Sequence, residues 1–199
     1  MIKIPTKIKN IITVVFLIVA PIIGIVLMWI WTNWSRRVKI TLSVIFIIFI
    51  SSPFIIYPLI VQPYQVSGES MSPTLHKGQH FLGNKFIYKN SSPQRGDIVV
   101  LKSPLNLQME MVKRIVGLPG EQIMIQNGKV YINGSILQEL YLAQDTHTQE
   151  GSFLRENETV TISNGQYVVL SDNRISNVDS RDFGFIPQQH IIGKYWFRY

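Results

Sequence analysis

Two long apolar runs without a charged residue, at 10–32 and 40–61, constrain this chain more than any other feature. A helix rises about 1.5 Å per residue, so each run is long enough to cross a hydrocarbon core about 30 Å thick. Pro21 and Pro53 lie inside the runs, and proline is tolerated in membrane helices. The first run is too long for a cleaved secretory signal and lacks a small-x-small exit. We therefore expect two transmembrane helices, at about 10–32 and 40–61.

The charged residues are divided unevenly along the chain. The first 62 residues carry six of the 19 Lys and Arg residues, whereas all 12 acidic residues lie at or after Glu69. Arg36, Arg37 and Lys39 precede the second run, and no Lys or Arg follows it until Lys77. Because positive residues stay on the cytoplasmic side, we expect a short cytoplasmic loop between the spans and an external segment after residue 62. Most of the net charge of +7 therefore comes from basic residues that flank the membrane helices, and it does not indicate nucleic-acid binding.

The remainder of the chain, 63–199, has the pattern of a β domain. Short runs rich in β-branched residues, such as 97–101 and 111–116, alternate with turn signals. Asn-Gly dipeptides at 127–128, 133–134 and 164–165 favour tight turns. No long helical period occurs there, and 138–158 is polar and unpatterned. We predict a mainly β chain, in which two transmembrane helices (1–62) precede an antiparallel, barrel-like catalytic domain (63–199).

Composition excludes several kinds of site. The absence of cysteine rules out disulfides, Cys-ligated metals and a thiol nucleophile. None of the four histidines lies in a motif with a serine and an acid. No metal-ligand spacing or nucleotide-binding loop is present, so we expect no metal and no cofactor.

A serine and a lysine offer a different route to nucleophilic catalysis. A serine hydroxyl needs a base to take its proton, and a lysine can serve if burial keeps its amine neutral. Lys113 lies in the apolar run 111–116, and Ser70 follows the second membrane run by nine residues. Taken alone, Ser70 could be an ordinary turn residue and Lys113 an outward-facing charge.

Four segments together resemble the conserved boxes of bacterial type I signal peptidases, in the family's order. They are Gly-Glu-Ser-Met-Ser-Pro-Thr-Leu at 68–75, Arg-Gly-Asp-Ile-Val-Val at 95–100, Lys-Arg-Ile-Val-Gly-Leu-Pro-Gly at 113–120, and the segment 171–184. The resemblance implies a serine endopeptidase that cleaves signal peptides from exported preproteins after small-x-small sites. In this mechanism Ser70 forms an acyl-enzyme and Lys113 is the general base.

The resemblance also implies a location and partners. We expect a multi-pass protein of the bacterial cytoplasmic membrane, with its catalytic domain on the extracytoplasmic side. Its partners would be signal peptides and the lipid bilayer, with proximity to the export translocon and no role for nucleic acid.

Supporting roles follow from the same resemblance. The Ser70 backbone N–H would stabilise the oxyanion, and Gly68 stands where some family members have a serine that helps. A bracing network behind the active site and apolar substrate pockets are both expected. The network residues are Arg114, Asp172, Asp179 and Arg181, and the pocket residues are Val66, Met71, Leu75, Met111 and Val112.

The last box departs from the family pattern at one point. The family usually has Asn-Ser before x-Asp-Ser-Arg, and its serine hydrogen-bonds the lysine. This chain has Ser176-Asn177 instead. Either the Asn177 amide oxygen accepts from Lys113, or Ser176 reaches the lysine after a local shift.

Three alternatives share parts of this pattern. A self-cleaving SOS-type repressor would need a DNA-binding domain where the membrane runs stand. A specialised peptidase for pilus or conjugation substrates differs only in pocket detail. A non-catalytic homologue that binds export substrates would have no need of both Ser70 and Lys113, which are present here.

Overall fold

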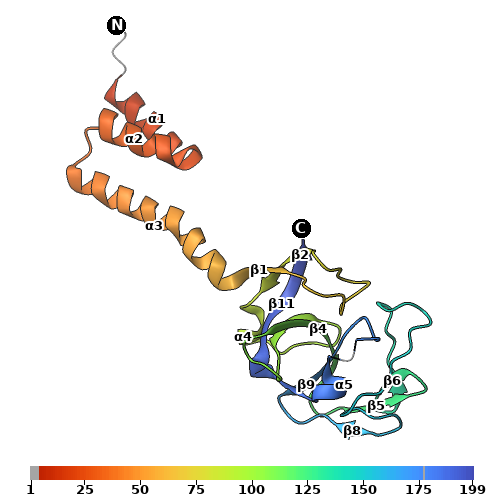
Figure 1. The fold of residues 1–199 in the computed structure, drawn as a ribbon. Helices are drawn as coiled ribbons and strands as arrows, with labels where there is room; N and C mark the ends of the chain where they lie inside the picture. The colour runs from red at the N-terminus through yellow and green to blue at the C-terminus, as the bar shows by residue number, and fades with distance from the viewer. Residues whose placement is uncertain (1–4, 177) are drawn as a thin grey trace. The chain divides into compact units, whose positions relative to one another are not determined.

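The computed structural model describes residues 5–176 and 178–199, and the chain divides into two compact units, 1–58 and 59–199. The first unit contains α1 (Thr6–Val19), α2 (Pro21–Trp31) and most of α3 (Arg36–Ile60). The second unit contains all the strands (Figure 1).

The first apolar run forms two helices, so the predicted continuous helix over 10–32 is wrong. Pro21 has no N–H, its ring would clash with the carbonyl four residues earlier, and it disfavours the helical region for the preceding residue. Ala20 accordingly leaves the helix with φ −139° and ψ 74°. Helix α2 then packs against α1 through Gly24, where an added Cβ would lie 2.4 Å from the Leu17 nitrogen.

One helix among the described residues, α3, is long and apolar enough to cross a membrane, judged by length and composition. It corresponds to the second predicted span and continues through Pro53 and Pro58. Helices α1 and α2 have 14 and 11 residues, or about 21 and 17 Å, and each is shorter than a bilayer core. The prediction of two spanning helices is therefore not confirmed.

The second unit is mainly β and antiparallel, as predicted. A seven-stranded sheet has the order β1-β2-β11-β3-β4-β9-β10 and remains open between β1 and β10, so it is barrel-like only in part. A four-stranded sheet has the order β7-β6-β5-β8. The strands of the larger sheet are β1 (Val61–Gln65), β2 (His80–Asn84), β3 (Ile98–Lys102), β4 (Glu110–Gly117), β9 (Gln166–Leu170), β10 (Ile186–Pro187) and β11 (Ile191–Arg198). Those of the smaller are β5 (Gln122–Gln126), β6 (Lys129–Ile132), β7 (Ser135–Ile136) and β8 (Val160–Thr161).

Two of the three Asn-Gly dipeptides form the predicted hairpin turns. Asn127 and Asn133 have positive φ, as do the glycines that follow them, and they join β5 to β6 and β6 to β7. Gly165 also has positive φ, but it precedes β9, whose partners are β4 and β10. That turn therefore connects the two sheets.

The hydrophobic core lies in three clusters of buried side chains. One is built on the buried face of the smaller sheet and includes Ile123 and Leu154. A second lies under β3, β4 and β9, and the third holds the segment after β1 against β3. Short helices α4 (Ile87–Asn90) and α5 (Ser180–Phe183) and a 3-10 turn at Gln188–His190 complete the domain. Segment 138–158 has no helix or named strand, as predicted.

Candidate active site

Ser70 lies on the loop that follows β1, and core packing holds this loop in place. Its neighbour Met71 and, one turn later, Leu75 are each 1% exposed and belong to the third core cluster. From the opposite side, the Asn173 backbone N–H donates to the Ser70 carbonyl oxygen at 2.9 Å. Ser70 itself is half-buried. The packing on both sides of Ser70 therefore limits where its hydroxyl can lie.

Lys113 lies in the middle of β4, opposite Val99 of β3, and only 2% of it is exposed. Burial penalises its charged form and lowers the pKa of Lys113 from 10.5 to about 8. Among its charged neighbours, Asp179 and Asp172 oppose this shift and Arg181 adds to it. The amine is therefore neutral in a large fraction of molecules near pH 8.

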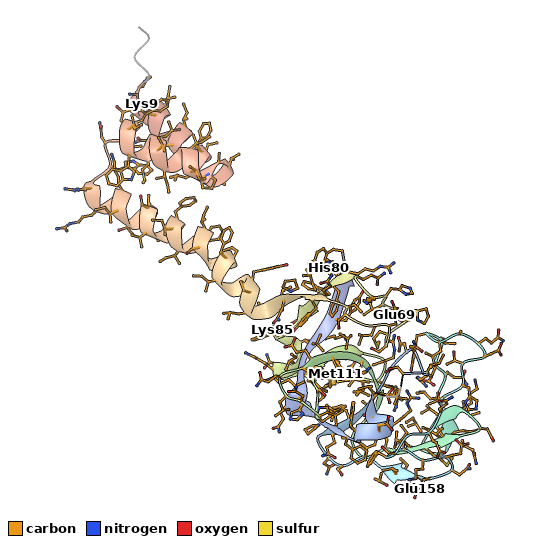
Figure 2. The ribbon with its side chains drawn as sticks, viewed as in Figure 1. Lys9, Glu69, His80, Lys85, Met111 and Glu158 are labelled. Atoms are coloured by element: carbon orange, nitrogen blue, oxygen red, sulfur yellow. The ribbon has the colours of Figure 1, made fainter. Side chains whose placement is uncertain are left out.

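Ser70 and Lys113 line the same pocket, which has a volume of about 290 Å³. Figure 2 labels Glu69, which precedes Ser70, and Met111, which precedes Lys113 by two residues, in this part of the domain. Within the described residues no hydrogen bond joins Ser70 to Lys113; the Lys113 Nζ donates instead to Ser171 Oγ at 2.8 Å. Catalytic hydrogen bonds often tighten only when substrate binds.

The sequence-predicted pocket residues fall into two groups. Val66, Met71, Met111 and Val112 line the pocket, together with Gly68. Leu75 is absent from the lining and packs in the core cluster beneath it. Leu75 therefore supports the loop that carries Ser70.

Asp179 and Arg181 form a fully buried ion pair. The Arg181 Nε and Nη2 donate to the two Asp179 carboxylate oxygens, both at 2.8 Å. Burial opposes ionisation of Asp179, but hydrogen bonds and charge from Arg181 outweigh it and hold the Asp179 pKa below its usual range. The Asp179 carboxylate also accepts from the Ser171 backbone N–H at 3.0 Å.

Asp172 and Arg114 form a second bidentate pair beside the first. Arg114 Nε and Nη2 donate to the two Asp172 oxygens at 2.8 and 2.6 Å. Asp172 also accepts from the Thr74 hydroxyl at 2.6 Å, four residues after Ser70. The four predicted network residues thus tie the Ser70 loop and β4 to segment 171–181.

Sequence reasoning missed four side chains at this network, Arg174, Thr148, Glu139 and Ser171. Arg174 is 2% exposed and donates to the Ser171 carbonyl at 2.8 Å, to Thr148 Oγ1 at 2.6 Å and to Glu139. Thr148 and Glu139 come from the unpatterned segment 138–158, where the sequence carries no signal for them. Ser171 was missed as well, because only the pairing of β4 with β9 brings it close to Lys113.

The sequence offers two partners for Lys113, the Asn177 amide and the Ser176 hydroxyl. Asn177 lies outside the described residues. The Ser176 backbone N–H donates to the Asn173 carbonyl, and its carbonyl accepts from Arg181. The lysine donates to Ser171, and not to Ser176.

No group of three or more His, Cys, Asp or Glu side chains suited to a metal ion occurs in the described parts of the chain. The pocket itself is lined by the Ser70 hydroxyl and the buried Lys113 amine, among other side chains.

Comparison with known proteins agrees with the resemblance of the four boxes. The model of the family described as "Signal peptidase, peptidase S26" matches residues 31–199. Signal peptidase IB of Staphylococcus aureus is 34% identical over 171 residues, which cover 80% of this chain and 86% of that protein. Signal peptidase I of Bacillus amyloliquefaciens is 36% identical over 153 residues, covering 74% and 78%.

A crystal structure of a signal peptidase I from Enterococcus faecalis V583 is also similar, with 32% identity and a TM-score of 0.43. It covers 52% of this chain and 97% of its own. On the family match and the two curated relatives, this chain belongs to the S26 signal peptidase family.

Proposed function

We propose that this chain is a membrane-anchored serine endopeptidase that removes N-terminal signal peptides from exported preproteins. The observation that carries the proposal is the buried Lys113 amine, with its pKa lowered to about 8, in the same pocket as Ser70. The chain's membership of the S26 family supports the assignment of the substrate class.

In the proposed reaction, Ser70 Oγ attacks the scissile carbonyl carbon while the neutral Lys113 amine takes the hydroxyl proton. The Ser70 backbone N–H, which donates to no described residue, stabilises the oxyanion of the tetrahedral intermediate. The Lys113 ammonium then protonates the leaving amine, and an acyl-enzyme remains on Ser70. The regenerated amine activates a water molecule, which hydrolyses the ester and restores Ser70.

An unpaired strand edge supports the proposed mode of substrate binding. The pairing of β9 with β4 covers Arg114 to Gly117, so residues 110–113 pair with β3 on one side and with no described strand on the other. An extended peptide can add to such an edge through backbone hydrogen bonds. Its side chains would then enter the pocket lined by Val66, Met71, Met111 and Val112.

The proposed anchor is α3, whose first turn carries Arg36, Arg37 and Lys39. Positive residues favour the cytoplasmic side, so the catalytic unit would lie outside. A multi-pass topology requires the first apolar run to cross as well. Reporter fusions at the N-terminus and at residue 34 test this, because two spans place these points on opposite sides of the membrane.

The decisive experiment is cleavage of a signal-peptide-bearing precursor by the full chain purified in detergent. Wild-type protein and Lys102→Ala, a change at an exposed lysine of neighbouring β3, should cut after a small-x-small site. Ser70→Ala and Lys113→Ala should not. Activity in Ser70→Ala would refute the nucleophile, and an inactive wild type would refute the proposed function.

A further inference from the structure

The Lys113 amine has a hydrogen-bond partner other than the Ser176-Asn177 pair expected from the sequence. Its Nζ donates to Ser171 Oγ at 2.8 Å. Both residues are buried, with 2% and 0% exposed. It is the one hydrogen bond that Nζ makes within residues 5–176 and 178–199.

The strand register explains why these two side chains meet. Strand β4 pairs with β9 so that Arg114 lies opposite Leu170. One step further along this antiparallel register, Lys113 lies opposite Ser171. Directly opposed residues have Cβ atoms about 5 Å apart on the same face of a sheet, within reach of a lysine and a serine.

The backbone of Ser171 is held from two directions. Its N–H donates to Asp179 Oδ2 at 3.0 Å, and its carbonyl accepts from Arg174 Nε at 2.8 Å. Asp179 is itself held by two hydrogen bonds from the Arg181 side chain. The backbone that carries the Ser171 hydroxyl is therefore held by buried arginine and aspartate side chains.

We propose that Ser171 is a positioning residue that aims the Lys113 amine at Ser70. This inference rests on the proposed function. A neutral amine has a single lone pair, so donating one N–H to Ser171 limits the directions in which that lone pair can point. A general base works only within hydrogen-bond reach of its proton, and misplacement by about 1 Å can cost about a hundredfold in rate.

A hydroxyl suits this task because it carries no charge. A carboxylate at the same place would stabilise the ammonium form and keep the lysine protonated near neutral pH. The charged groups that influence the amine, Asp172, Asp179 and Arg181, are already engaged in their own ion pairs. In this proposal Ser171 has the part that the serine of the Asn-Ser pair has in the family.

The test compares Ser171→Ala and Ser171→Thr with Ser180→Ala in the full chain in detergent. Ser180 is equally buried, but its hydroxyl accepts from the Val169 backbone N–H and does not contact the lysine. We expect Ser171→Ala to lower kcat by about ten- to a hundredfold with little change in KM, and to move the pH midpoint of kcat/KM to lower pH. Ser171→Thr, which keeps a hydroxyl, should recover most of the loss. Ser180→Ala should change the melting temperature without shifting the pH midpoint of kcat/KM.

Two measurements separate this inference from the proposed function. If wild type cuts a precursor and Ser171→Ala has the same kcat and the same pH midpoint, the inference about Ser171 is refuted and the proposed function stands. The same holds if Ser180→Ala reproduces the kcat loss and pH shift, or if Ser171→Thr is as slow as Ser171→Ala at an unchanged melting temperature.

If wild type does not cut the precursor, the proposed function is refuted. The hydrogen bond from Lys113 to Ser171 is then tested by a titration that needs no substrate. The ¹³Cε resonance of Lys113, assigned by its loss in Lys113→Arg, is titrated in wild type and Ser171→Ala. Removing an acceptor from the ammonium should move the midpoint to lower pH. An unchanged midpoint would overturn the inference.

Discussion

Replacing Lys113 with methionine removes a buried ionisable group but keeps most of its apolar stem. Folding lowers the pKa of this lysine from 10.5 to about 8. At about 1.4 kcal/mol per pH unit, the native state is destabilised by about 3 kcal/mol wherever the lysine must be charged, which is below pH 8. Between pH 8 and 10.5 the unfolded chain binds more protons than the native one, so wild-type stability rises with pH across that window.

The methionine variant lacks this cost at every pH. It also loses the hydrogen bond to Ser171, which contributes about 1 kcal/mol. We therefore expect Lys113→Met to be more stable than wild type by about 2 kcal/mol at pH 7, with the advantage lost by about pH 10.5.

The assay is denaturant unfolding of the full chain in detergent micelles, followed by near-UV circular dichroism at pH 7, 8, 9 and 10. Comparing variants at each pH cancels the titration of groups that both share. Lys102→Met removes an exposed lysine of β3 and serves as the control. A difference between Lys113→Met and wild type that stays constant from pH 7 to 10 would refute the reasoning.

Three further outcomes are expected. For wild type, kcat/KM should rise about tenfold per pH unit below about pH 8 and level off above it, because only neutral Lys113 accepts a proton; a flat profile from pH 6 to 9 would contradict this. Asp172→Ala should lower the free energy of unfolding by about 3–5 kcal/mol, since it leaves the buried Arg114 guanidinium without its carboxylate; a denaturation midpoint close to wild type would argue otherwise. Gly117→Ala should lower the free energy of unfolding by about 1–3 kcal/mol, because the new Cβ would lie 2.4 Å from Ile162 Cδ1. An unchanged melting temperature would contradict this prediction.

Much of the fold could be predicted because its signals are local. The Asn-Gly turns at 127–128 and 133–134 need positive φ, which those two residue types supply wherever they stand. The β-branched runs correctly predicted β3 and β4, and the second apolar run predicted α3. The order of the boxes pointed to Ser70 and Lys113, whose roles remain a proposal. The first apolar run does not form the single helix predicted from its hydropathy. Hydropathy carries no information on the steric clash between Pro21 and the preceding turn.

The sequence by itself determined the family, the mainly β architecture and the Ser70 and Lys113 candidates, since these depend on residue types at short spacings. Only the tertiary structure decided which hydroxyl meets the lysine. The partner, Ser171, is 58 residues away along the chain, and the strand register brings it opposite Lys113. The buried contacts of Arg174 with Thr148 and Glu139 are likewise decided by chain packing, because the segment that supplies both partners has no periodic pattern.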